Sequence, residues 1–569
     1  MIKFEDLQFE HISIEEIKAY LEPLFDKLTK AKSADEYLDI FKKINDYRLH
    51  VSTNVNLFQI HFSIDTTNDK AVEEVNYWDE NSPLYEELIN RFYKIVINNP
   101  YKEELIEYIP NAFYDIANNA LLAFDPRIME EIAAENKLVS KYGALMAGIR
   151  VTIRNEEYNL SSASKFTSSK DRVLRKEAYD AMVEAISTKE DEIDDIYDQL
   201  VHVRDKMAKK MGYDNYIDLG YKRLGRTDYD QHDLVAYRKA ILDYVVPCNN
   251  KLRAMQAQRL GLDKLDYYDI NVEFKDGNPK VIGDADALID AASRFYNDLS
   301  KETGEFFNEM KEGAYWDLLS KANKQGGGYC TILQDVKMPF IFANFNGTQA
   351  DVNTLVHEVG HSLQCYTTAR ANKMNFTETE FPSYEAAEIN SMGMEIFAYP
   401  YYEYFFGDDA DKYRFMHLSE TMTFIPYGTL VDAFQHEIYA HPDMSKEDRK
   451  ATWRKLELLY CPERECFDHN KYLSKGTYWY RQGHIFNTAF YYIDYTIAQV
   501  CALEFWVRNE AHDENSFNDY MTLARLGGNY SFLKLLKKAN LESPFDPEVI
   551  KKITNKVMDK INSTDTSKF

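Results

Sequence analysis

Glycine and proline are scarce in the first 200 residues of this 569-residue chain. That stretch contains only two glycines, Gly143 and Gly148, and five prolines. Apolar residues recur there at helical spacing, as in Ile14, Ile17 and Leu21. Glycine and proline are the residues that most often interrupt helices, so their scarcity leaves few alternatives to helix. We therefore predict that residues 1–200 are mainly helical.

The pentapeptide His357-Glu358-Val359-Gly360-His361 lies in a run with helical character from Asp351 onward. Histidines four apart on a helix are about 40° apart around the axis and about 6 Å apart along it, so both can reach one metal ion. Zinc with an open fourth position lowers the pKa of its water to about 7, and a neighbouring carboxylate can accept the proton. The motif predicts a catalytic zinc site with Glu358 as the general base.

The residues around the motif indicate that its helix is buried. Leu355, Val356, Val359 and Leu363 interleave with the histidines, and Gly360 leaves room for another backbone to approach. Buried imidazoles need polar partners. A pair of core histidines satisfied by hydrogen bonds, without a metal, is the alternative interpretation.

A third ligand is expected in a second buried helix after Pro382, where Glu385, Glu388 and Glu395 compete. Glu388 and Glu395 share one helix face with Ser391 between them, whereas Glu385 lies in the first turn, where it can simply favour the helix dipole. On geometry we prefer Glu388 as the ligand, with Ser391 and Glu395 orienting it or His361. The alternative is that all three glutamates satisfy a polar helix interface.

Residues 326–395 resemble the thimet oligopeptidase and oligoendopeptidase F group of zinc peptidases, and the chain length suits the oligoendopeptidase F branch. The resemblance implies one zinc ion per chain on His357, His361 and Glu388. Many members carry a histidine where this chain has Gln364, but that histidine is not among the usual zinc ligands. The matching segments are 326–330, 339–348, 351–362 and 388–395.

A peptidase of this kind needs hydrogen-bond donors aimed at the oxyanion that forms during hydrolysis. If His484 opens a helix, Tyr491 and Tyr495 lie within roughly 20° of its face, whereas Tyr492 lies off it. The segment resembles the histidine-plus-tyrosines segment of the family. This implies that Tyr495, or else Tyr491, stabilises the intermediate and that His484 contacts substrate. With 42 tyrosines in the chain, packing is the alternative role for each of them.

The run Gly326-Gly327-Gly328 lacks the spacing and the Lys-Ser/Thr pair of a phosphate-binding loop. The β-branched and aromatic residues after it predict two strands, 329–333 and 340–345. A strand edge beside the zinc helix can hold an extended peptide by backbone hydrogen bonds. We expect substrate contacts from Gly327, Gly328 and Tyr329, which the resemblance implies form a mobile loop, and from Ala343 and Asn344. A simple hairpin turn is the alternative for the glycine run.

The resemblance implies a mainly α, multi-helix, zincin-type metallopeptidase fold, with a small β-sheet beside the zinc helix and a deep substrate channel between helical lobes. We expect an N-terminal helical lobe over residues 1–200 and a catalytic metallopeptidase domain over residues 201–569. An Asp276-Gly277 turn also suggests a small β element over residues 272–278.

The net charge and the number of cysteines limit the classes of binding partner and the cellular compartment that we expect. The net charge of −26 argues against nucleic acid or an anionic membrane as a partner, and it can favour cationic or neutral peptides. The N-terminal segment has acidic residues where a signal peptide needs a basic start, and no apolar run is clean enough to span a bilayer. Six scattered cysteines form no disulfide framework. We predict a cytoplasmic protein.

The expected function is zinc-dependent cleavage of internal peptide bonds in short, unstructured oligopeptides. The first alternative is an exopeptidase on the same scaffold, either a dipeptidyl carboxypeptidase or an aminopeptidase. It would need a charged residue that captures a peptide terminus, and Arg481 is a possible partner for a carboxylate. The second alternative, a non-catalytic peptide-binding protein, is disfavoured by the intact Glu358.

Overall fold

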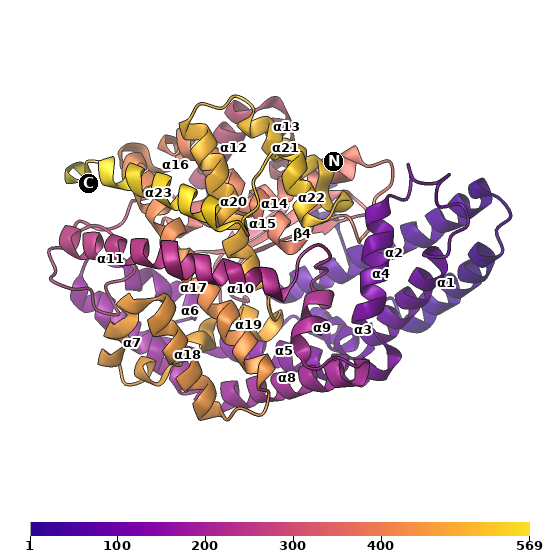
Figure 1. The fold of residues 1–569 in the computed structure, drawn as a ribbon, viewed down its shortest axis with the longest axis horizontal. Coiled ribbons are helices and arrows are strands. Elements are labelled where there is room, and N and C mark those ends of the chain that lie inside the picture. Colours follow the sequence, from indigo (N-terminus) through magenta and orange to yellow (C-terminus); the bar gives the residue numbers. More distant parts are fainter. Residues whose placement is uncertain (1) are drawn as a thin grey trace.

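The computed structural model describes residues 2–569, and helices dominate it (Figure 1). The first five long helices gather mainly at one end of the molecule and show that residues 1–200 are mostly helical, as predicted. This region also contains a short antiparallel hairpin of β1 (Val151–Ile153) and β2 (Glu156–Tyr158). The five helices are α1 (Ile14–Thr29), α2 (Ala34–Ile64), α3 (Asp69–Val96), α4 (Asn111–Ala123) and α5 (Met129–Gly148).

The remainder of the chain continues as helices around one small sheet. Before the sheet come α6 (Leu160–Ser164), α7 (Arg172–Ser187), α8 (Glu190–Met211), α9 (Tyr216–Arg223), α10 (Gln231–Ala240), α11 (Val246–Leu260), α12 (Ala285–Leu299) and α13 (Lys301–Gly313). After the sheet come α14 (Ala350–Ala371), α15 (Tyr384–Phe397), α16 (Glu403–Phe406), α17 (Ala410–Ala440), α18 (Lys446–Tyr460), α19 (Gly483–Asn487), α20 (Tyr492–Glu510), α21 (Ser516–Leu526), α22 (Phe532–Lys538) and α23 (Pro547–Ser563).

The sheet has three strands in the order β3-β5-β4. Strands β4 (Tyr329–Leu333) and β5 (Met338–Phe345) are antiparallel and match the two strands predicted after the glycine run. β3 (Trp316–Leu319), which the sequence did not reveal, pairs in parallel with the other side of β5. Helix α14 packs on β5 and β4, so the small sheet lies beside the helix that carries the histidine motif, as expected.

Two large hydrophobic cores hold the chain together. One is built almost entirely from residues between Ile12 and Ala117, and the other extends from Leu57 to Ile561. Phe376, in the connection between α14 and α15, is the one buried member of the first core from outside that range. The segment that joins α14 and α15 is therefore packed into the core of the N-terminal helices. The domain boundary near residue 200 stays a prediction.

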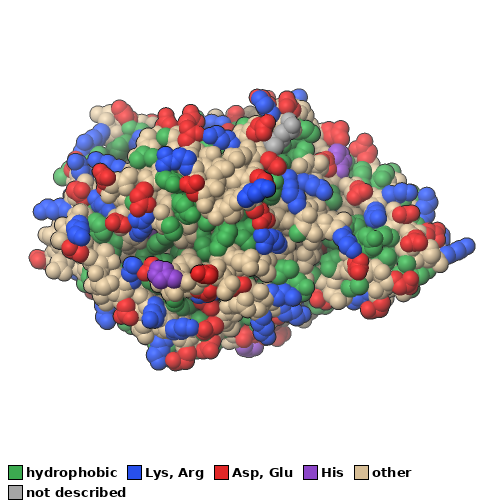
Figure 2. Space-filling view, turned by 90° about the horizontal axis from the view of Figure 1, so that it is seen from above, with side chains coloured by type: hydrophobic (Ala, Val, Ile, Leu, Met, Phe, Trp, Pro, Cys, Tyr) green, Lys and Arg blue, Asp and Glu red, His purple; other side chains and the backbone are tan. Residues whose placement is uncertain are grey.

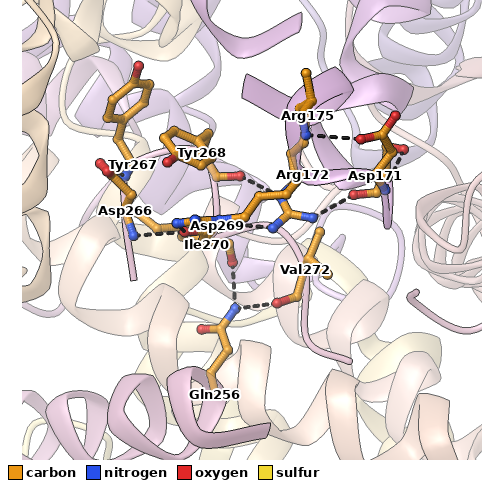
Figure 3. Close-up of polar contacts among 12 residues, drawn as sticks. Asp171, Arg172, Arg175, Gln256, Asp266, Tyr267, Tyr268, Asp269, Ile270 and Val272 are labelled. Atoms are coloured by element: carbon orange, nitrogen blue, oxygen red, sulfur yellow. Dashed lines mark hydrogen bonds and ion pairs between the residues drawn. The ribbon is translucent and has the colours of Figure 1, made fainter. Parts of the chain in front are cut away.

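Residues 272–278 do not form the β element suggested by the Asp276-Gly277 turn. A helix side chain instead hydrogen-bonds the backbone at the start of this segment (Figure 3). The Gln256 amide donates to the carbonyls of Ile270 and Val272, at 3.0 and 2.8 Å. Asp269, just before this segment, is held by ion pairs with Arg172 and Arg175. A turn signal alone could not reveal that helix side chains would satisfy this backbone.

Charges of both signs are interspersed over the face in Figure 2, without a broad field of Lys and Arg. All six cysteines are free. Within residues 2–569, every helix is either too short or too polar to be a membrane span.

Candidate metal centre and active site

The site is built where helices α14 and α15 touch at the centre of the molecule (Figure 1). The contact is close because Gly360 has no side chain: a Cβ there would lie 2.6 Å from the carbonyl oxygen of Asn390 and 2.7 Å from the Cα of Ser391. Gly360 thus admits the neighbouring backbone, as predicted from its place in the motif. Its two neighbours in the motif, Val359 and His361, are buried.

The structure brings the three predicted metal ligands together. The Nε2 atoms of His357 and His361 lie 3.2 and 3.3 Å from the same oxygen, Oε2 of Glu388. One possible donor atom from each of the three residues lies within 4.8 Å of the others. A tetrahedral zinc site with ligands at about 2.0–2.2 Å places neighbouring donors about 3.3–3.6 Å apart. The donor set and its spacing therefore fit a zinc ion.

Further side chains hold these donors in place. Glu395 accepts from His357 Nδ1 at 2.7 Å, and its other oxygen lies 2.7 Å from His417 Nε2. The Ser391 hydroxyl donates to Glu388 Oε2 at 2.8 Å. Ser391 and Glu395 therefore occupy the orienting positions that the helix pattern suggested, although Glu395 contacts His357 and not His361. His417 comes from α17, and no sequence signal indicated it.

Glu385, the competing candidate, lies apart from the histidine pair. Among the described residues, neither of its buried carboxylate oxygens has a hydrogen-bond partner, and the residue is 1% exposed. Burial raises the pKa of Glu385, whereas the nearby Arg226 lowers it by a smaller amount. Glu385 is not among the residues whose donor atoms converge on the possible metal position.

Glu358 is buried beside the histidines, and its Oε2 atom has no hydrogen-bond partner within residues 2–569. Burial raises the pKa of Glu358, although His357 and His361 lower it in part. A raised pKa makes a carboxylate a stronger proton acceptor. Gly328 lies against this carboxylate, since a Cβ at Gly328 would be 3.3 Å from Glu358 Oε1.

The helix that would align His484 with Tyr491 and Tyr495 is not continuous. Helix α19 ends at Asn487, α20 begins at Tyr492, and Phe490 between them adopts a positive φ of 69°. The Phe490 backbone is held at both ends, because its N–H donates to Gln435 and its carbonyl accepts from Arg226. Helical periodicity could not anticipate a break that distant side chains stabilise.

The break still brings His484 and the two predicted tyrosines together. Tyr495 Oη lies 3.2 Å from His484 Nε2, and the Tyr491 hydroxyl donates to Glu388 Oε1. Burial raises the pKa of each hydroxyl well above its usual range, so both remain donors. Tyr492, expected to lie off this face, packs 4.9 Å from the His484 ring but does not line the cavity.

Gln482 completes a hydrogen-bond chain that the sequence did not reveal. Tyr427 donates to Gln482 Oε1 at 2.9 Å, which directs the Gln482 amide nitrogen toward His484 Nδ1, also at 2.9 Å. Burial lowers the pKa of His484 to about 4, so the imidazole is neutral near pH 7. Because Nδ1 accepts, Nε2 carries the proton and donates to Tyr495. The Tyr495 proton is then free to point into the cavity.

Gly327, Gly328 and Tyr329 line the same cavity as the histidines, but Ala343 and Asn344 do not. β5 is the central strand, so Ala343 is fully buried between its neighbours. The Asn344 amide donates to the carbonyls of Gln325 and Gly327 and so fixes the glycine loop. Neither residue therefore lines the cavity where we expected it to contact substrate, because β5 is paired on both sides.

The free edge available for peptide pairing is also shorter than a whole strand. Helix α2 covers the C-terminal end of β4, where the Asn56 amide donates to the Ile332 carbonyl at 2.8 Å. The other end, from Gly326 to Cys330, faces the cavity. Backbone pairing with a peptide is therefore confined to this end of the edge strand.

The cavity has a volume of about 1330 Å³ and is lined from both the N-terminal helices and the C-terminal half. Asp115 of α4 and Tyr142 of α5 line it together with Glu358 and Tyr495. A cavity of this size, walled by distant parts of the chain, can enclose several residues of an extended peptide but no folded domain.

Comparison with known proteins identifies the family. The sequence profile described as "Peptidase family M3" matches residues 165–282 and 291–554, more than half of the chain, and the profile "Peptidase M3 N-terminal domain" matches residues 4–124. The chain belongs to peptidase family M3. This M3 protein is 40% identical to PZ peptidase A, solved with an inhibitor, at a TM-score of 0.96 over 99% of our chain and 100% of that chain.

Two further relatives indicate the branch. A protein from Bacillus anthracis str. Ames, provisionally identified as oligoendopeptidase F, is 39% identical with a TM-score of 0.92 over the whole of both chains. The oligoendopeptidase F homolog of Mycoplasma pneumoniae is 28% identical over 43% of our chain. That match spans 40% of the Mycoplasma protein's length. Our chain is an M3 protein of the oligoendopeptidase F branch with the predicted mainly α fold.

Proposed function

We propose that this M3 protein is a zinc-dependent endopeptidase that cleaves internal bonds of short, unstructured oligopeptides. His357, His361 and Glu388 would hold the ion, which when bound would polarise the scissile carbonyl and make water more acidic. Three protein ligands leave one position open, which is the pattern of catalytic rather than structural zinc sites.

Each remaining side chain has a role that follows from its contacts. Glu358 accepts the proton of the attacking water and returns it to the leaving amine. The Tyr495 hydroxyl donates a hydrogen bond to the developing oxyanion and is free to do so because His484 donates to the Tyr495 oxygen. Tyr491 is already committed to Glu388, so we assign it to holding that ligand. Gly327 and Gly328 offer backbone groups to the peptide.

One observation carries the proposal: two imidazoles converge on a single Glu388 oxygen next to a buried Glu358 oxygen that has no partner. Buried polar atoms are normally hydrogen-bonded, and exceptions concentrate at functional sites. A pair of merely structural histidines would leave Glu358 unexplained.

The test uses a ladder of oligopeptides, free or blocked at both ends, with the cuts mapped by mass spectrometry. The wild type, analysed for metal, is compared with Glu358→Gln and with a control, Glu385→Gln, which changes another buried cavity carboxylate. We expect internal cuts in blocked peptides, lost by at least about two orders of magnitude in Glu358→Gln, while Glu385→Gln stays within about threefold of wild type.

Other outcomes would change the assignment. Cuts confined to free peptide ends would indicate an exopeptidase, and bound zinc without any cuts would indicate a peptide-binding protein. Near-normal turnover by Glu358→Gln would refute its role as base. The cytoplasmic location, the oligopeptide partners and the absence of nucleic-acid or membrane partners are part of the proposal.

A further inference from the structure

Arg481 is a cation in the cavity wall without an anionic partner. It ends the 3-10 turn Tyr478–Arg481, three residues before His484, and lines the same cavity as the histidines. Its guanidinium lies over the ring of Tyr478 at 4.8 Å and near that of Tyr179 at 5.9 Å. Within residues 2–569, no Asp or Glu is among the groups that act most strongly on it; tyrosines surround it instead.

The other two cations that line this cavity are already paired. Arg223 forms an ion pair with Glu135 at 2.7 Å, and Lys324 forms one with Asp317 at 2.6 Å. Arg464, which also lies over the Tyr478 ring, pairs with Glu457 at 3.2 Å. In a chain with a net charge of −26, an arginine left without a carboxylate at the cavity wall needs an explanation.

The surroundings of Arg481 favour an anion. Burial raises the pKa of Tyr478, yet Arg481 and Arg464 together bring it below its usual range, which reflects a local excess of positive charge. A half-buried guanidinium has lost part of its hydration, which costs free energy unless a carboxylate replaces the water. Its planar fork matches a carboxylate with two parallel hydrogen bonds, and its flat face stacks on aromatic rings as it does here.

We propose that Arg481 is a carboxylate-binding subsite of the peptide cavity, a refinement that rests on the proposed peptidase function. Its Cα lies at most about 11 Å from that of His484, because three residues separate them. The carboxylate it binds therefore belongs to a peptide residue within about three positions of the group that His484 contacts. That carboxylate is either the C-terminus of a short peptide or an Asp or Glu side chain.

Four peptides of one parent sequence separate these two sources. All are blocked at the N-terminus. The C-terminus is either a free carboxylate or an amide, and the residue three positions beyond the mapped cut is either Glu or Gln, so the four peptides cover every combination. The values of kcat/KM are measured for wild type, Arg481→Gln and Arg481→Lys. Arg464→Gln is the control, because it removes a guanidinium from the same Tyr478 ring but not from the cavity wall.

We expect wild type to cleave one carboxylate-bearing pair at least about tenfold faster than its neutral partner, as for a charge-assisted hydrogen bond. Arg481→Gln should lose this preference while cleaving the neutral peptides at rates within about threefold of wild type. Arg481→Lys should keep part of the preference, and Arg464→Gln should keep all of it. A preference for the free C-terminus identifies the terminal carboxylate; a preference for Glu over Gln identifies a side chain.

The inference is overturned if metal-loaded wild type cleaves all four peptides equally, or if Arg481→Gln keeps the preference. Calorimetric binding of the same peptides to metal-loaded Glu358→Gln makes the test independent of turnover. Tighter binding of carboxylate-bearing peptides, lost on adding Arg481→Gln, would support the subsite even if the proposed endopeptidase activity failed. Equal binding of all four would overturn the subsite and leave the peptidase proposal intact.

Discussion

Replacement of Gly360 by alanine tests whether the close contact of α14 and α15 builds the metal centre. The new Cβ would lie 2.6 Å from a backbone oxygen of α15, whereas ordinary contacts begin near 3.4 Å. The obstacle is helix backbone, which cannot swing aside as a side chain can. The two helices would therefore have to separate by roughly 0.8 Å, the difference between these two distances.

The energetic cost has two parts. Overpacking of this kind costs about 1–3 kcal/mol, and a clash with backbone belongs in the upper half of that range. Alanine recovers about 1 kcal/mol of helix propensity. Gly143→Ala is the matched control, because it also lies inside a helix but its new Cβ would meet nothing closer than 3.9 Å. We expect Gly360→Ala to be less stable than this control by about 2–3 kcal/mol.

The metal site should respond more sharply than stability. Moving α15 shifts Glu388 away from His361, and displaced ligand geometry typically costs about 10–100-fold in metal affinity. Differential scanning fluorimetry and competition with a chromophoric zinc chelator measure the two effects. If Gly360→Ala melts with the Gly143→Ala control and binds zinc as wild type does, the close-contact reasoning is refuted.

Three further predictions follow from the site and the fold. Glu388→Gln should weaken zinc binding by at least about tenfold in the chelator competition, since it replaces an anionic ligand with a neutral one; unchanged affinity would exclude it as a ligand. Gln482→Leu should lower kcat by about tenfold with little change in KM, because His484 would lose the partner that sets its tautomer; a normal kcat would refute the role of the hydrogen bond from Gln482 to His484. Burial raises the pKa of Glu504 to about 7, so its contribution to stability is full below about pH 4.5 and is lost as pH rises through 7. Glu504→Gln should therefore be more stable than wild type by about 1–3 kcal/mol at pH 8 but not at pH 4.5; parallel stability curves from pH 4.5 to 8 would contradict this.

The fold could be predicted from the sequence in those segments whose structure depends only on their own residues. The glycine-poor N-terminal helices and strands β4 and β5 depend on periodicity and residue type, so they could be predicted. The break before Tyr492 and the absence of a strand at residues 272–278 could not. In both places a side chain from another element, Gln435 of α17 or Gln256 of α11, satisfies the backbone and overrides the local signal.

The same distinction applies to the site. Spacing within one helix was enough to place His357, Glu358 and His361 on a common face, and the spacing of Glu388, Ser391 and Glu395 predicted a second polar face. Spacing could not show which strand of the sheet has a free edge. Pairing on both sides of β5 removes Ala343 from the cavity, and only the tertiary arrangement decides that.

The sequence by itself determined that His357 and His361 share one face of a helix, because residues four apart are aligned by the 3.6-residue repeat of that helix alone. The tertiary structure decided how these residues are supported and what they can meet. His417 and Tyr427, both on α17, reach Glu395 and Gln482. Each of these contacts joins residues on separate elements, and no pattern within a single element records which elements will pack together.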